Sequence, residues 1–268
     1  MLKTEMRNPR TRHLDKMSTA EMLTTMQDET RVAVQAVDAA LPDVAKAVEA
    51  IAAAMAKGGR LVYVGAGTSG RLGVLDASEC PPTFGVPEGR VVGLLAGGLA
   101  AFSRAGEPEE DDPVGGEKAF LALVPTANDV VVGISAAGGA KFVLGALAAA
   151  KKCGCLTVGV TSNAGSALDT CADISIVTET GAEVVTGSTR LKAGTAQKLV
   201  LNMISTAVMV KLGNVYENVM VNLKPSNEKL KARMVGIVAD LQNVDRATAE
   251  ARLAANDWCI RKVLDAAN

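Results

Sequence analysis

The strongest constraint on the fold comes from five short apolar runs separated by longer stretches of helical pattern. The runs are rich in β-branched residues and occupy residues 61–64, 91–95, 130–134, 156–160 and 174–177. Continuous apolar runs are typical of parallel strands that are covered by helices on both faces. The sequence therefore predicts an α/β fold with a doubly wound parallel sheet of about five strands. Ligands of such sheets bind beyond the carboxyl ends of the strands, so the loops there are the places to search for chemistry.

Helical patterns extend the chain on both sides of the predicted sheet. Ser18 and Glu21 form a capping box, which predicts a helix, and Pro42 fits the first turn of a second one. Beyond the sheet the apolar spacing predicts further helices, over 189–213, 229–241, 245–256 and 257–267. We expect one α/β domain with N-terminal helices over residues 1–222 and a C-terminal helical extension over 223–268.

Composition excludes several classes of function. A formal net charge of -1 and 3% aromatic residues argue against a nucleic-acid surface or an anionic membrane surface. The five cysteines are scattered and His13 is the only histidine, so we expect no metal site. No signal peptide is recognisable, and the longest apolar stretch, 199–210, is too short to span a bilayer. We expect a cytoplasmic protein.

The first loop with chemical potential is Gly65-Ala-Gly-Thr-Ser-Gly-Arg71, which follows a strand and opens a helix. Its glycines let backbone N–H groups approach an anion at the helix N-terminus, and Thr68 and Ser69 add hydroxyl groups. The spacing matches the dinucleotide fingerprint GxGxxG, but no acidic residue ends the next strand, which closes on Leu95-Ala-Gly-Gly98. A tight turn that only packs the helix is the alternative, and it does not explain the Thr-Ser pair.

Two acidic segments are candidates for proton transfer. Glu79 precedes Pro81 and Pro82, which we expect to end a short helix, and partial burial there would raise its pKa and suit a general acid. An exposed loop glutamate is the alternative. The run Glu107-Pro-Glu-Glu-Asp-Asp112 is of a kind that usually forms a solvated face.

Two further loops carry groups that suit an anion. Ser135-Ala-Ala-Gly-Gly139 follows the third run, and on its own it also fits a plain strand-to-helix turn. Near residue 189, Arg190 and Lys192 place positive charge in a helical first turn, where the dipole disfavours it. This conflict predicts a bound anion or a carboxylate partner such as Glu183, and the alternative is a capped helix with exposed basic residues.

Two long motifs together resemble the N-acetylmuramic acid 6-phosphate etherase family. Residues 65–85 and 186–203 carry the resemblance, and the segments 4–11 and 218–230 are also similar. The resemblance implies a sugar isomerase (SIS) fold, flavodoxin-like, with a five-stranded parallel sheet flanked by helices and helical extensions at both ends. It implies cofactor-free release of D-lactate from a phosphorylated amino sugar, by elimination and then water addition, in a homodimer that recycles cell-wall sugars.

The resemblance also assigns roles to residues. By position in the motif Glu79 resembles the general acid, and by its spacing downstream Glu110 resembles the base. Two carboxylates with separated pKa values fit this division of labour. The candidates for substrate binding are Gly67, Thr68, Ser69, Gly70, Arg71, Ser78, Ser135, Gly138, Glu183, Thr186, Ser188, Thr189 and Lys192.

The sequence departs from the family pattern in the loop 135–141. Hydroxyl residues expected at 137 and 140 and an arginine expected at 139 are replaced, while Ser135 is kept and Lys141 offers charge. From the resemblance we also expect a longer helical C-terminus than this sequence shows. The altered loop keeps two alternatives open: a non-catalytic sugar-phosphate sensor of the same fold, and an etherase with altered substrate specificity. The paired carboxylates favour an enzyme.

Overall fold

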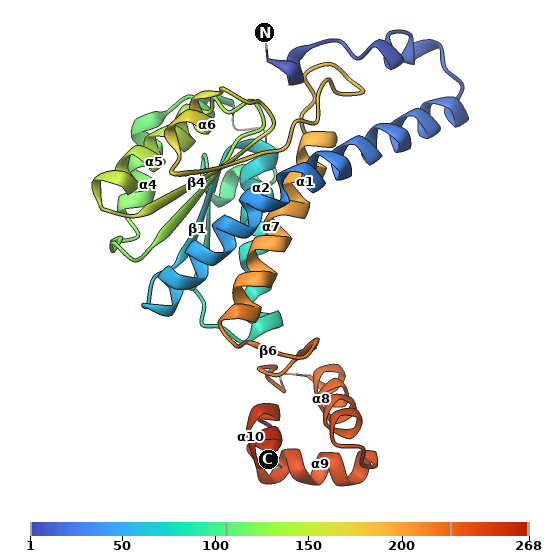
Figure 1. Ribbon diagram of the computed structural model, residues 1–268, viewed down its shortest axis with the longest axis vertical. Coiled ribbons are helices and arrows are strands. Elements are labelled where there is room, and N and C mark those ends of the chain that lie inside the picture. Colours follow the sequence, from blue (N-terminus) through green and yellow to red (C-terminus); the bar gives the residue numbers. More distant parts are fainter. Residues whose placement is uncertain (1, 105–106, 226, 267–268) are drawn as a thin grey trace. The chain divides into compact units, whose positions relative to one another are not determined.

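The computed structural model describes residues 2–104, 107–225 and 227–266, and of Glu107 only the backbone (Figure 1). The chain divides into two compact units. The first unit comprises residues 1–78 and 91–205, and the second comprises residues 79–90 and 206–268. The first unit holds the predicted sheet, and the second holds the last three helices.

The predicted parallel sheet is confirmed and lies in the first unit. Its strands are β1 (Leu61–Gly65), β2 (Val91–Leu95), β3 (Val130–Ile134), β4 (Leu156–Thr161) and β5 (Ile174–Val177). The strand order is β2-β1-β3-β4-β5, and every pair is parallel. The strand order reverses between β1 and β3, so the carboxyl ends of these two strands flank the position where such sheets bind ligands.

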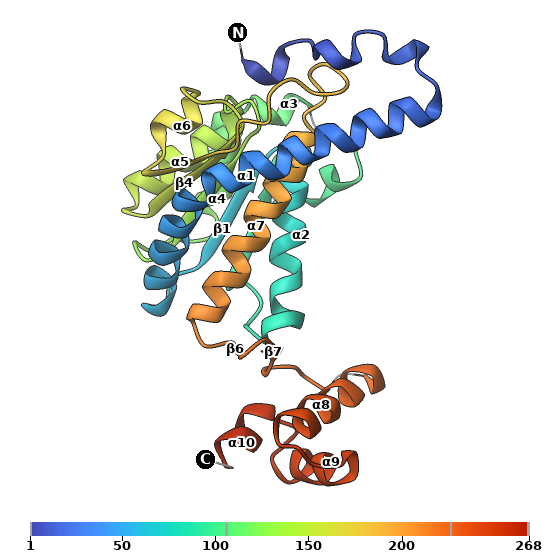
Figure 2. The same ribbon diagram turned by 45° about the vertical axis from the view of Figure 1, so that its right-hand side comes forward.

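Helices cover both faces of this sheet (Figure 2). On one face Val62, Val64 and Val131 pack against α4 (Pro113–Leu121) and α5 (Lys141–Lys152). On the other face Tyr63 meets α2 (Gly67–Phe84), and its hydroxyl donates to Asp76 Oδ2 at 2.9 Å. The strands are buried from both sides, which is why they carry no apolar-polar alternation. Further helices of the first unit include α3 (Glu107–Glu110), α6 (Ala167–Cys171) and α7 (Lys192–Lys211), of which α7 extends into the second unit.

The prediction of two N-terminal helices is wrong, because a single helix, α1 (Thr19–Ala56), runs through Pro42. The predicted capping box of Ser18 and Glu21 is present at its start. Pro42 lies on the exposed side, so the carbonyl left without an N–H partner can face water. Val37, Ala40 and Val44 continue one buried stripe across the proline. Packing of that stripe on the sheet therefore outweighs the local preference for a break.

The expected break at Pro81 and Pro82 is also absent, because α2 continues to Phe84. Both prolines stand in the last turn, and the Gly85 N–H closes the helix by donating to the Pro81 carbonyl at 2.9 Å. Glu79 is therefore part of the helix rather than its last residue, and it is exposed.

The second unit contains the short antiparallel pair β6 (Val215–Tyr216) and β7 (Val219–Met220), followed by three helices. These are α8 (Glu228–Leu241), α9 (Arg246–Ala255) and α10 (Ile260–Asp265). Met234, Val238, Leu253 and Ile260 form part of their shared core. Residue 267, where the last predicted helix ends, lies outside the described residues. In the described part of the chain, no helix has the length and apolarity needed to cross a bilayer.

Candidate functional site

A small cavity lies at the carboxyl ends of β1 and β3, where the sheet topology predicts a ligand. It measures about 120 Å³ and is called here the strand-end cavity. Its polar lining consists of Thr68 and Ser69 after β1, Ser135 after β3, Thr189 before α7, and Glu110 from the acidic run. Residues far apart in sequence therefore bring four hydroxyl groups and one carboxylate together. Among the described residues that line this cavity there is no lysine or arginine.

The loop between β1 and α2 is built by close backbone approach. A Cβ atom on Gly70 would lie 2.4 Å from the Gly65 carbonyl oxygen, so only glycine fits there. This turn starts α2 beside the cavity and directs the N-terminus of the helix toward it. Ser69 Oγ donates to Gln197 Oε1 at 2.9 Å, and Gln197 Nε2 is buried without a partner. Gln197 was missed by the sequence reasoning, although it lies inside the second long motif.

The acidic run is divided among several tasks. Glu110 lines the strand-end cavity, whereas Glu109 and Asp112 line a separate cavity of about 470 Å³ beside β2. Asp111 pairs with Lys141 at 3.2 Å. Asp112 also caps α4 by accepting the Gly115 N–H at 2.8 Å. Only Glu110 of these four carboxylates lines the strand-end cavity.

Arg71, a predicted substrate-binding residue, holds the segment that leads to the acidic run. Its guanidinium donates to the backbone carbonyls of Ala101, Phe102 and Arg104 at 2.9, 2.7 and 2.5 Å. Three bonds from one planar group fix the path of this segment. The geometry therefore favours a positioning role for Arg71.

The altered loop after β3 keeps a defined shape. Ser135 Oγ accepts the Gly138 N–H at 3.1 Å, and Gly138 has a φ of 74°. A Cβ atom on Gly138 would lie 2.1 Å from Ser166 Oγ, so this position requires glycine on two counts. Lys141, considered above as a replacement charge, pairs with Asp111 and does not line the strand-end cavity.

Glu183 and Lys192, both predicted to bind substrate, are buried in a polar network at the start of α7. Glu183 accepts the backbone N–H groups of Lys192 and Ala193, each at 3.0 Å, and so caps the helix. Burial raises the pKa of Glu183, although these two backbone bonds act in the opposite direction. The Lys192 ammonium forms an ion pair with Glu29 of α1. The predicted conflict is therefore relieved for Lys192, with Glu183 capping the backbone and Glu29 pairing with the ammonium.

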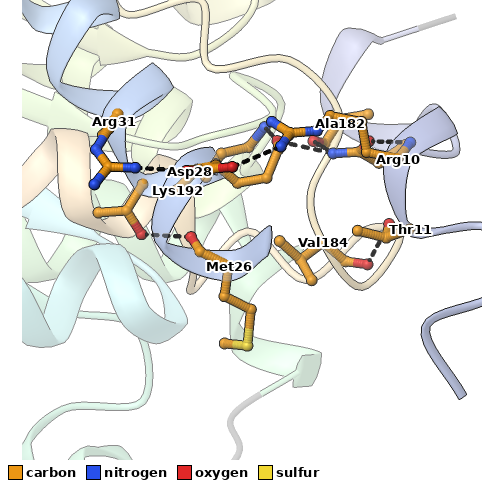
Figure 3. A network of polar contacts seen from close by, with 11 residues as sticks. Arg10, Thr11, Met26, Asp28, Arg31, Ala182, Val184 and Lys192 are labelled. Atoms are coloured by element: carbon orange, nitrogen blue, oxygen red, sulfur yellow. Dashed lines mark hydrogen bonds and ion pairs between the residues drawn. The ribbon is translucent and has the colours of Figure 1, made fainter. Parts of the chain in front are cut away.

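Glu29 joins the N-terminal segment to this network, next to the bond between Arg10 and Asp28 that is drawn in Figure 3. It accepts from Asn8 Nδ2 at 2.8 Å and from Arg10 at 3.2 Å, while Arg10 also bonds Asp28 at 2.9 Å. Asn8 and Glu29 were missed by the sequence reasoning. The available signal was the position of Glu29, four residues before Ala33 and on the buried stripe of α1.

A second buried network ties α2 to α7 within the first unit. Asp76 accepts from Tyr63 at 2.9 Å, from Asn202 Nδ2 at 2.6 Å and from Ser205 at 3.2 Å. Burial raises the pKa of Asp76, and the three hydrogen bonds oppose that shift. The network fixes the spacing of the two helices that carry Thr68 and the residues after Thr189.

The remaining predicted residues have other environments. Glu79 lies on α2 in the second unit and is not among the residues that line the strand-end cavity. Ser78 is exposed and donates to the Leu75 carbonyl at 2.7 Å. Thr186 is exposed and Ser188 half-buried, and neither lines that cavity.

Comparison with known proteins places these features in a family. Residues 43–151 match the family model of the glucokinase regulatory protein N-terminal SIS domain. A protein of Halalkalibacterium halodurans named N-acetylmuramic acid 6-phosphate etherase is 54% identical over 252 residues, covering 94% of this chain and 85% of that protein. A protein of Salmonella typhi with the same name is 49% identical over 263 residues, covering 98% and 89%.

Solved structures with low sequence identity share the fold. A phosphoheptose isomerase from Francisella tularensis has a TM-score of 0.53 at 17% identity, covering 72% of this chain and 98% of that one. A phosphoheptose isomerase from Neisseria gonorrhoeae has a TM-score of 0.52 at 18% identity, covering 71% and 98%. These matches support the SIS architecture of the sheet and its helices.

Proposed function

The chain belongs to the family of N-acetylmuramic acid 6-phosphate etherases, and we propose that Glu110 and Glu79 are the base and the acid of its reaction. The reaction releases D-lactate from N-acetylmuramic acid 6-phosphate and leaves N-acetylglucosamine 6-phosphate. The observation that carries the proposal is the strand-end cavity, in which Glu110 meets four hydroxyl side chains at the carboxyl ends of β1 and β3. Because the similar proteins are named etherases, the sensor alternative is not favoured.

The chemistry requires two separate proton transfers. Opening of the sugar ring exposes an aldehyde at C1, which makes the C2 proton acidic. Glu110 takes that proton, and the C3–O bond to the lactyl group breaks while Glu79 protonates the departing ether oxygen. Water then adds to C3 of the unsaturated aldehyde, and C2 regains a proton. Each transfer by a positioned carboxyl group contributes about 10²- to 10⁴-fold to the rate.

The phosphate has a suitable position in the same cavity. The N-terminus of α2 and the hydroxyls of Thr68 and Thr189 present hydrogen-bond donors to it. Ser135 remains from the altered loop as a further hydroxyl. We propose that these donors hold the phosphate without a cation, so that phosphate binding does not depend on the residues replaced at 137, 139 and 140.

The first test is a D-lactate release assay on N-acetylmuramic acid 6-phosphate beside the unphosphorylated sugar. We expect release from the phosphorylated sugar and at least tenfold less from the other. Release from neither by the folded protein refutes the proposed reaction. Equal release from both refutes the role given to the phosphate and favours the etherase of altered specificity.

The roles of the carboxylates are separated by two variants and one matched control. Glu110→Gln is expected to lower lactate release by about 10²- to 10⁴-fold, whereas Glu109→Gln, beside it but in the other cavity, keeps activity within about twofold. In D2O, Glu79→Gln still exchanges the substrate C2 proton without releasing lactate, and Glu110→Gln loses both. Retained exchange in Glu110→Gln would remove it as the base.

We also propose a homodimer, supported by an exposed apolar stripe on α1. Leu23, Val34 and Leu41 are 59%, 45% and 42% exposed, and their spacings of eleven and seven residues place them on one helix face. Sedimentation is expected to give twice the chain mass, and Val34→Glu to shift it toward one chain. A monomeric unmutated protein contradicts this proposal. The five free thiols support a cytoplasmic location.

A further inference from the structure

A second cavity lies beside the strand-end cavity, and its basic side chains have no role in the reaction proposed above. It measures about 290 Å³ and is lined by Thr68, Leu72, Arg190, Gly194, Thr195, Lys198 and Leu199. It is called here the cation cavity. Thr68 lines both cavities, and Arg190 follows Thr189 of the strand-end cavity directly in the chain. The two cavities are therefore neighbours that meet at the start of α2 and α7.

The cation cavity supplies the positive charge that the strand-end cavity lacks. In the described part of the chain, no hydrogen bond or ion pair engages the Arg190 guanidinium, which is exposed. Arg190 also precedes the N-terminus of α7, where a positive charge is disfavoured unless an anion is near. Glu183 and Glu29 already serve the Lys192 backbone and ammonium. The charge of Arg190 is thus left for a ligand.

Lys198 is held in place by the buried network behind it. Its ammonium donates to Asn202 Oδ1, and Asn202 Nδ2 donates to the buried Asp76 at 2.6 Å. One of the three N–H groups of the ammonium is used in this way, which leaves two for a ligand. Lys198 lies one helical turn after Gly194, so it meets the same cavity as Arg190.

We propose that the cation cavity binds the carboxylate of the lactyl group of the substrate, an inference that rests on the proposed function. The lactyl group combines a carboxylate with a methyl group on the same carbon. The guanidinium fork and the ammonium match the carboxylate, and Leu72 and Leu199 offer apolar contact to the methyl. Backbone N–H groups and hydroxyls of the strand-end cavity match the phosphate instead. Each anionic group of the substrate then has its own cavity.

In this assignment the residues of the cation cavity take part in the reaction without transferring a proton. The lactyl carboxylate stays ionised before and after the C3–O bond breaks, so Arg190 and Lys198 stay bound to it throughout. The proton for the ether oxygen still comes from the acid. Arg190 and Lys198 orient the leaving group, and they make the chain selective for sugars that carry an acidic ether.

The experiment compares ligands that share the phosphate but differ in the lactyl group. The variants are Arg190→Gln and Lys198→Gln, with Lys46→Gln on the exposed side of α1 as the control. The ligands are N-acetylmuramic acid 6-phosphate, its lactyl amide, and the product N-acetylglucosamine 6-phosphate as a competitive inhibitor. The folded state of each variant is checked by circular dichroism.

We expect Arg190→Gln and Lys198→Gln to raise KM for the acid substrate by about 10- to 100-fold, the loss of one charge-assisted bond. The inhibition constant of the product should stay within about twofold. The unmutated protein should prefer the acid over the amide by a similar factor, and Arg190→Gln should lose that preference. Lys46→Gln should match the unmutated protein.

Two results would overturn the assignment. An equal rise in the product's inhibition constant would place the phosphate in the cation cavity, and an unchanged KM in both variants would leave the cavity without a role. Absence of lactate release by the unmutated protein refutes the proposed function itself, and it is seen before any variant is made. The failure of one proposal is thereby distinguished from that of the other.

Discussion

The buried pair of Lys192 and Glu29 should be among the most sensitive points for stability. Their side chains are 5% and 6% exposed, and Lys192→Met removes one charge while nearly keeping the volume. Breaking a buried pair costs about 3–5 kcal/mol, because the other charge is left uncompensated. Asn8 and the half-exposed Arg10 remain on Glu29, so we expect the lower end, about 3 kcal/mol. A loss of that size corresponds to roughly 6–12 °C in Tm.

The assay is urea and thermal unfolding of the whole chain, monitored by circular dichroism. Tryptophan fluorescence would report on the second unit, because the single tryptophan, Trp258, lies there. The double variant Glu29→Met/Lys192→Met should recover most of the stability, since both members of the buried pair are removed and neither is left without its partner. Lys151→Met, which breaks an exposed pair with Asp173, should cost less than about 1 kcal/mol. The reasoning would be refuted if the free energy of unfolding of Lys192→Met lay within about 1 kcal/mol of that of the unmutated protein. It would also be refuted if the losses of the two single variants added up in the double variant.

Three further predictions concern backbone and side-chain environments in the first unit. Gly138→Ala should lower stability by about 1–2 kcal/mol or more, because of its positive φ, while Gly139→Ala, with open space around it, should be tolerated in the same thermal scan. Burial acts to raise the pKa of Asp129, but the hydrogen bonds from Arg60 outweigh this effect, so the pKa lies below its usual value. Asp129→Asn should therefore cost about 2–3 kcal/mol in urea unfolding at pH 7, and its deficit should shrink as the pH falls below about 4; a constant deficit contradicts this. Burial raises the pKa of Cys155 to about 11, so its alkylation at neutral pH, followed by mass spectrometry, should be about 100-fold slower than in urea, and equal rates would contradict the burial.

The sequence by itself determined the sheet and the position of its ligand site. Unbroken apolar runs such as 130–134 specify strands that are buried on both faces, and the glycines of 65–70 specify a close turn at the end of the first of them. These features are local, because strand burial and glycine geometry show in a few consecutive residues. The capping box at Ser18 was readable for the same reason.

Only the tertiary structure decided which polar residues meet. Local signals at Pro42 and Pro81 predicted helix breaks, yet packing of the buried stripe and the exposed position of the ring kept α1 intact. Glu29 and Lys192 are 163 residues apart, and their pairing depends on how α1 crosses the start of α7. The division of Glu109 and Glu110 between two cavities likewise appears only in the folded chain. Such long-range contacts cannot be recognised from sequence periodicity, because the pattern around each residue reflects only its own helix or loop.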